Sequence, residues 1–189
     1  ASLTATSIEL EAVAVDNRVT GDAQASITID GATLDADTIT ITAEAQVTAT
    51  ADMVLSLPVD VAIIDVTSDA LVLMTGNTQI ISSGDVFITA SSVVTTSALS
   101  HASSSGSVAA DAAVATSIVD SSATVLVNGN TSFVVGGALN LGAENFRTVT
   151  TVADGTAGGA TAAGASVAVA VVSGNTEASL SGGVQVSAG

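Results

Sequence analysis

The sequence predicts an all-β protein, a solenoid of about seven or eight rungs, from its composition, its internal repeats and its strand-like alternation. Nearly half of the 189 residues are hydrophobic, yet there are three Phe and no Tyr or Trp. Val, Ile and Thr favour pleated strands, and small side chains suit a narrow interior. The composition therefore favours strands around a thin core.

A block of about 45–55 residues recurs along the chain, as in other repeat architectures. Four strands close on an alanine, and these alanines follow one another at similar but unequal steps: Ala43, Ala90, Ala143 and Ala188. Unequal spacing with a preserved strand phase is typical of a solenoid whose loops vary in length. We predict a single domain over residues 1–189 with degenerate repeats at approximately 1–43, 44–90, 91–143 and 144–189.

Each block contains the same elements in the same order. It has a strand led by alanine, a Gly or Asn turn, a second strand, and a later apolar strand. If each block forms two coils stacked about 4.8 Å apart, the result is a rod roughly 35–40 Å long. The alanine-led strands begin at Ala25, Ala70, Ala123 and Ala178, and the apolar strands cover 10–15, 58–66, 109–119 and 164–172.

The ends of the chain carry no amphipathic helix or charged cap, so we expect no capping element at either end. Joining Gly189 to Ala1 of another copy would place Ala188 and Ala25 about as far apart in sequence as Ala43 and Ala70 are. We therefore expect a window of a longer array or a subunit of a head-to-tail filament, with another copy of the chain as its partner.

Three stretches near the C-terminus, at 165–172, 175–178 and 183–188, together resemble filamentous-haemagglutinin-like giant surface proteins of bacteria. They are an alternating small/Val strand, an Asn/Thr turn leading to Ala, and a Gly-Val-x-Val-x-Ala strand, respectively. The resemblance covers essentially the whole chain. It implies a right-handed parallel β-helix, secretion, and adhesive or structural work at the cell surface.

The charge of the chain excludes several partners. It has 18 acidic residues and only two basic ones, Arg18 and Arg147, which gives a formal net charge of −16. A nucleic-acid binder needs a basic stripe, and an anionic membrane repels such a surface. We expect no nucleic acid and no membrane insertion, and surface glycans or neighbouring cells remain further candidate partners.

Catalytic residues are sparse, and we expect no enzyme. The single histidine, His101, lies in a Ser-rich stretch that reads as a loop or outer coil, with no Gly-x-Ser-x-Gly elbow beside it. Asp35 with Asp37, and Asp60 with Asp65, are the closest acid pairs for a polysaccharide-degrading β-helix enzyme. Without Lys or aromatic platforms, such a site is poorly supplied, and these acids are interpreted as turn residues.

Two binding chemistries stay open. Asp30, Asp35 and Asp37 lie in one short segment and are candidate calcium ligands, although no EF-hand loop or Gly-Gly-x-Gly-x-Asp repeat occurs. No other cofactor is expected. Thr38, Thr40 and Thr42 alternate as in an ice-binding strand, but the equivalent positions of later blocks are Asp85, Phe87 and Thr89, then Ala138, Asn140 and Gly142.

The sequence thus predicts an extracellular structural protein, a rigid stalk or a head-to-tail filament segment for adhesion or matrix. Alternatives are an adhesin module that contacts carbohydrate, calcium or ice, and a β-helix carbohydrate enzyme.

Overall fold

The computed structural model describes residues 1–16, 19–55 and 58–189, so Arg18 lies outside the described residues. No helix in these parts of the chain is long and apolar enough to cross a membrane. The described residues form ten strands: β1 Ser2–Asp16, β2 Thr20–Asp30, β3 Thr33–Leu55, β4 Val59–Thr75, β5 Gln79–Ser82, β6 Val86–Val127, β7 Ser132–Val135, β8 Leu139–Ser173, β9 Thr176–Leu180 and β10 Gln185–Ala188.

All strand pairs are parallel, as a β-solenoid requires, so the predicted fold class is confirmed. One ladder marks the start of each coil: Ser2, Thr33, Gln79, Ser132 and Gln185. Successive members of this ladder are one whole repeat block apart, so each block is one coil and not two. The described chain forms four coils and starts a fifth, and the expected seven or eight rungs were too many.

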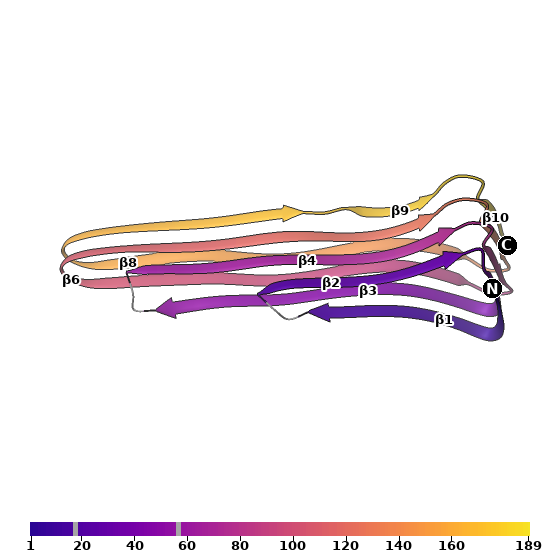
Figure 1. Cartoon of the computed structure of the whole chain (residues 1–189), viewed down its shortest axis with the longest axis horizontal. Coiled ribbons are helices and arrows are strands. Elements are labelled where there is room, and N and C mark those ends of the chain that lie inside the picture. The colour runs from indigo at the N-terminus through magenta and orange to yellow at the C-terminus, as the bar shows by residue number, and fades with distance from the viewer. Residues whose placement is uncertain (17–18, 56–57) are drawn as a thin grey trace.

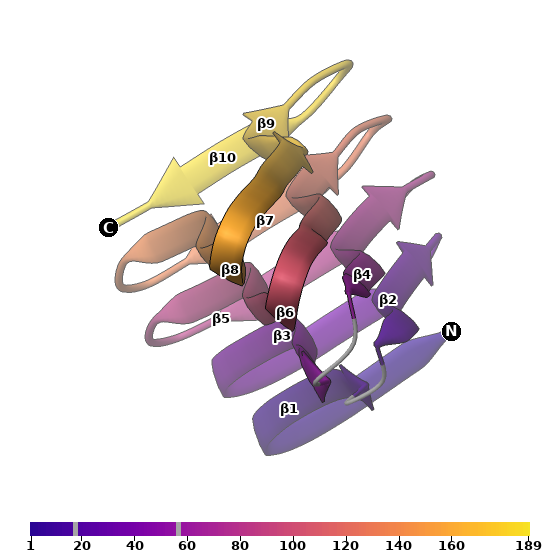
Figure 2. The ribbon, with the colours of Figure 1, turned by 90° about the vertical axis from the view of Figure 1, so that its left-hand side faces the viewer.

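The long axis of the molecule runs along the strands, and the coils stack across it (Figures 1 and 2). In each coil the chain runs out in one layer, the outbound sheet, reverses, and comes back in the other, the return sheet. Both termini lie at one end of the long axis, the proximal end, and β6 and β8 reverse at the other, the distal end. The leg from Val86 to Gly106 spans roughly 65 Å, whereas the stack of coils is only about 20 Å high.

The coils lengthen towards the C-terminus because their distal ends extend. Between the second and third coils, Leu55 pairs with Ala102 before the distal reversal. After the reversal Val59 pairs with Ala112, so the third coil uses more residues to turn. Between the first two coils, register partners are also further apart in sequence after the reversal than before it. Between the third and fourth coils, this separation is the same on both legs. The molecule is therefore tapered, with its shortest coil at the N-terminus.

The proximal corners are set by a ladder of glycines. Gly31, Gly76, Gly129 and Gly182 occupy equivalent turns and have φ of 58°, 68°, 74° and 75°. Only glycine adopts this conformation freely. A Cβ on Gly129 would also lie 3.0 Å from the carbonyl oxygen of Gly76, and one on Gly182 would lie 3.0 Å from the backbone nitrogen of Gly129, so these two stacked corners leave little room for a side chain. The predicted Gly and Asn turns are confirmed at these positions.

The predicted strand equivalences hold for most of the chain. Ala43, Ala90 and Ala143 are register partners. Ala188 was placed wrongly, because it pairs with Val135 in the short proximal strand. The alanine-led strands match at Ala25, Ala70 and Ala123, but the fourth slips by two positions, since Ala123 pairs with Thr176.

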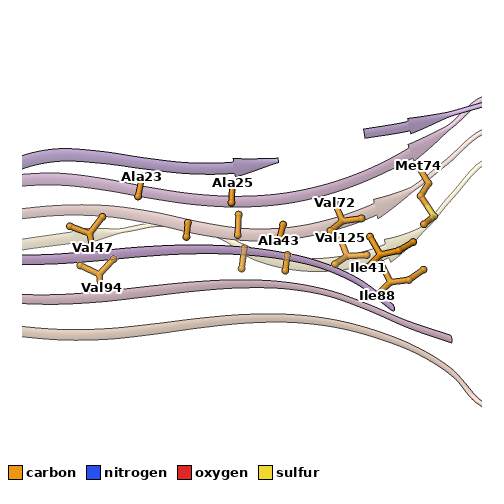
Figure 3. Close-up of a cluster of buried hydrophobic side chains, with 14 of the residues drawn as sticks. Ala23, Ala25, Ile41, Ala43, Val47, Val72, Met74, Ile88, Val94 and Val125 are labelled. Carbon is orange, nitrogen blue, oxygen red and sulfur yellow. The ribbon is translucent and has the colours of Figure 1, made fainter. Parts of the chain in front are cut away.

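The core is wide at the proximal end and thin along the two sheets (Figure 3). Bulky buried side chains such as Phe133, Ile80 and Met74 lie near the corners. Further out, alanines and serines face each other, and Ser92 Oγ donates to Ser68 Oγ and Ser68 O across the layers at 2.8 and 3.0 Å. Small side chains let the two sheets approach closely, which explains the composition.

We predict that Ile88→Ala destabilises the fold by about 2–5 kcal/mol, because Ile88 is fully buried between coils and its loss leaves a cavity. Ile81→Ala is the matched control, since Ile81 is 36% exposed on the outer face. Urea unfolding followed by circular dichroism measures both. Equal losses for the two variants would contradict the assignment of inner and outer faces.

Candidate functional sites at the open edge and the distal end

The fourth coil leaves its core face uncovered. In the third coil, Ala113 and Ala115 are fully buried. Their register partners in the fourth coil, Ser166 and Ala168, are exposed, as is the rest of the return leg over residues 158–178. This leg pairs with β6 on one side only, so its other edge presents unpaired backbone groups in the part of the chain that the structure describes.

Polar side chains partly close the C-terminal end of the core. Arg147 donates from Nε to Ser121 Oγ at 2.6 Å and from its guanidinium to Ser121 O at 2.9 Å. Asn145 Nδ2 donates to Ser121 O at 2.7 Å. These contacts join the two sheets. We expected no capping element at either end, and this polar bridge was not predicted. The equivalent residues of the earlier coils, Val94 and Val47, are apolar and gave no sign of it.

The column of the ladder that contains Arg147 has a different residue type at each edge of the stack. Its members are Asp16, Val47, Val94 and Arg147, one from each coil. By backbone register, Asp16 lies at the N-terminal edge and Arg147 at the C-terminal edge.

The outer face of the return sheet is apolar near the distal end. Val61, Val114 and Val167 are register partners on three successive coils, and Ile63 and Val169 continue the patch two positions further along. Val61 and Val167 are 43% and 52% exposed. Val167 and Val169 of this outer patch lie on β8, the same strand as the uncovered core face. Substitutions on the two faces of β8 can therefore be compared with each other.

The threonine strand considered for ice binding has the register that the sequence predicted. Thr40 and Thr42 lie opposite Phe87 and Thr89 by the pairing of β3 with β6, and Thr38 and Asp85 directly precede the paired residues. A regular threonine column occurs further along the outbound sheet, where it was not predicted: Thr48, Thr95 and Thr148.

His101 lies within β6, so its interpretation as a loop residue was wrong. Its side chain is 40% exposed, and its Nδ1 lies 3.8 Å from Asp154 Oδ2 in the next coil. Its backbone N–H donates to Asp60 Oδ2 at 2.9 Å. The histidine is thus paired with an acid on the surface of the outbound sheet.

Asp60 and Asp65, one of the two acid pairs considered in the sequence, lie on opposite faces of their strand. Asp60 and Asp65 both lie in β4 and not in a turn, and their odd spacing places Asp60 in the core and Asp65 on the surface. Asp35 lies on β3 beside Thr4 and Ile81. Asp37 Oδ1 accepts a hydrogen bond from Ser83 Oγ at 2.9 Å.

The three candidate calcium ligands do not form a cluster. Asp30 ends β2 in the return sheet and accepts from Thr75 Oγ1 at 3.0 Å, whereas Asp35 and Asp37 follow the corner on β3. Within residues 1–16, 19–55 and 58–189, no three His, Cys, Asp or Glu side chains come together as a metal site.

Two carboxylates are buried between the sheets at the distal end. Asp60 is 2% exposed and Asp111 is 7% exposed. Asp60 Oδ1 and both oxygens of Asp111 accept no hydrogen bond from the described residues. The sequence analysis did not single out Asp111. The available signal was its phase, because Asp111 alternates with Ala113 and Ala115 on the inward face of β6.

Comparison of the chain with protein-family models, with curated proteins and with solved structures found no match. The resemblance to filamentous-haemagglutinin-like proteins therefore stays a prediction, and the function has to be argued from the geometry.

Proposed function

We propose that the protein is an extracellular structural segment that assembles head to tail into a filament at the cell surface or in a matrix. The observation that carries this proposal is the uncovered core face of the fourth coil. Alanines and valines whose equivalents are buried in the third coil lie open there, and the backbone edge beside them is unpaired. A further coil stacked on this edge would cover the apolar side chains and pair with the free backbone groups.

The N-terminal coil of a second copy is the occupant that fits. It offers two edge strands, β1 with 15 residues in the outbound sheet and β2 with 11 residues in the return sheet, each able to pair in parallel with a leg of the fourth coil. Stacking places Asp16 of the second copy at the register position next to Arg147.

The taper shapes the resulting contact. The first coil is shorter than the fourth, so the distal part of the fourth coil stays outside the contact. Ser2–Ala5 and Gln185–Ala188 also occupy the same place in the cross-section, so one of these short strands must be displaced.

The dimensions favour a filament over a spacer. Four coils lengthen the stack by only about 20 Å, which makes the chain a poor stalk for its length. Repeated stacking instead produces a ribbon roughly 65 Å wide with flat outer faces. Such a ribbon gains stiffness from continuous backbone hydrogen bonds along its axis.

We predict that Val172→Lys prevents association, because Val172 shares its column with the buried Val119 and with Gly21 of β2, so the lysine points into the contact and stacking would bury its charge. Val171→Lys is the control, since Val171 lies on the opposite face of the same strand and is 52% exposed. Sedimentation velocity over a range of protein concentrations, with negative-stain electron microscopy, measures the assembly. Loss of assembly in Val171→Lys alone would show face-to-face association and overturn the head-to-tail proposal.

A charge exchange tests the register of stacking. Arg147→Asp should weaken association by about tenfold or more, because it introduces an acidic residue at the register position next to Asp16 of the next copy. The double variant Asp16→Arg with Arg147→Asp should recover the wild-type association constant. If the double variant associates no better than Arg147→Asp, the two residues do not meet.

A further inference from the structure

We propose that the distal end binds a hard divalent cation, best matched by calcium, between the two sheets, with Asp111 as its principal ligand. This site is separate from the stacking edge and does not depend on filament formation. Its residues come from the third and fourth coils, with Asp60 of the second coil beside them.

Asp111 is the side chain that most needs a positive partner. It is more than nine-tenths buried, with 7% of its surface exposed, and neither carboxylate oxygen accepts a hydrogen bond from the described residues. An ionised carboxylate in such a place is costly unless a donor or a cation neutralises it. Arg147, the arginine among the described residues, is bonded to Ser121 and does not reach Asp111 as a hydrogen-bond donor.

Oxygen atoms of the fourth coil surround the Asp111 carboxylate. The point where Gly155 would carry a Cβ lies 3.0 Å from Asp111 Oδ1, 3.1 Å from Ser166 Oγ and 3.3 Å from the carbonyl oxygen of Ala165. Three oxygens thus converge on the space beside Gly155. A carboxylate and a carbonyl oxygen repel each other at close range, and a cation between them turns this repulsion into attraction.

Two glycines keep this space open. A Cβ on Gly164 would lie 2.6 Å from Asp111 Oδ1, and a Cβ on Gly155 would meet all three oxygens. Neither glycine has a positive φ, so backbone conformation does not account for them. Their lack of a side chain leaves room around the carboxylate.

Asp60 supplies a second carboxylate nearby. It lies on the adjacent strand, two register positions from Asp111, which corresponds to about 8 Å between Cα atoms. Its Oδ2 is held by the backbone N–H of His101, and its Oδ1 is buried without a donor among the described residues. Ser104 Oγ, on the outbound sheet, is also buried and forms no hydrogen bond with the described residues.

The ligand chemistry selects the ion. Carboxylate, hydroxyl and carbonyl oxygens in a flexible arrangement suit calcium, whereas magnesium prefers a strict octahedron with several waters. Zinc prefers nitrogen and sulfur ligands, and His101 is engaged with Asp154 on the outer surface. An open cleft at the distal end, lined by Pro58, Ser103, Ser104, Ser105, Thr156 and Gly158, provides an approach.

The test is calorimetric titration of the chelator-treated full chain with calcium chloride in about 0.15 M salt, which screens weak binding to the acidic surface. We expect one calcium per chain, weaker binding of magnesium, and a rise in melting temperature with calcium. Asp111→Asn should weaken calcium binding about 100-fold or more and remove the rise, because it takes away the charged ligand.

Three further variants make the result specific. Ser166→Ala removes one ligand without changing the charge at an exposed position, so it should fold normally and weaken calcium binding several-fold. Asp65→Asn, which removes a surface charge from the same sheet, should bind as wild type does. The double variant Asp35→Asn with Asp37→Asn should also bind normally.

Equal titrations for wild type, Asp111→Asn and Ser166→Ala would overturn the site, as would the absence of saturable binding in the wild type. Loss of binding only in the Asp35→Asn, Asp37→Asn variant would place calcium at the proximal corner instead.

Discussion

Parallel pairing in strict register between successive coils is the constraint on which the rest of the structure depends. Each strand finds its hydrogen-bond partners in the coil before it, so every residue belongs to a column with its equivalents one coil away. A shift of one residue would turn every inward side chain outwards. The columns therefore fix the core, the glycine corners and the positions where charges meet.

The thin core is the second consequence of this arrangement. Ala43 and Ala25 lie in the core between the layers (Figure 3), and with so little separation the interior has no room for large side chains. Some buried polar side chains pair with each other across the gap, as Ser92 and Ser68 do. Asp111 has neither carboxylate oxygen hydrogen-bonded to the described residues, and a bound cation at the distal end would account for this burial.

The sequence was sufficient to predict the parallel solenoid, its glycine corners and most of its columns. The alternation of apolar and polar residues indicated which side chains point inwards. Ala43, Ala90 and Ala143 were correctly predicted to be equivalent, because small residues are required wherever the two sheets approach each other. It was not sufficient to predict the coil length. The two strands of each block look like two rungs, and nothing local shows that they are the two legs of one flattened coil.

The functional positions were harder to predict for the same reason. Asp111 and Arg147 have meaning only relative to their columns and to their place near the end of the stack. Arg147 follows two valines in its column, and Asp111 precedes a run of inward alanines. Asp60 and Asp65 are close in sequence, yet the pleat separates them onto opposite faces. Local spacing therefore suggested pairs that the fold does not make.

The coil length can be measured directly by disulfide trapping, since the chain has no native cysteine. Thr95 and Thr148 are register partners on adjacent strands, where the Cα atoms lie about 4.8 Å apart and within disulfide range. One coil per block predicts that Thr95→Cys with Thr148→Cys forms an intramolecular disulfide on mild oxidation, detected by peptide mass spectrometry, and that Thr95→Cys with Ser122→Cys does not. A disulfide in the second pair but not in the first would mean two coils per block and would contradict the structure.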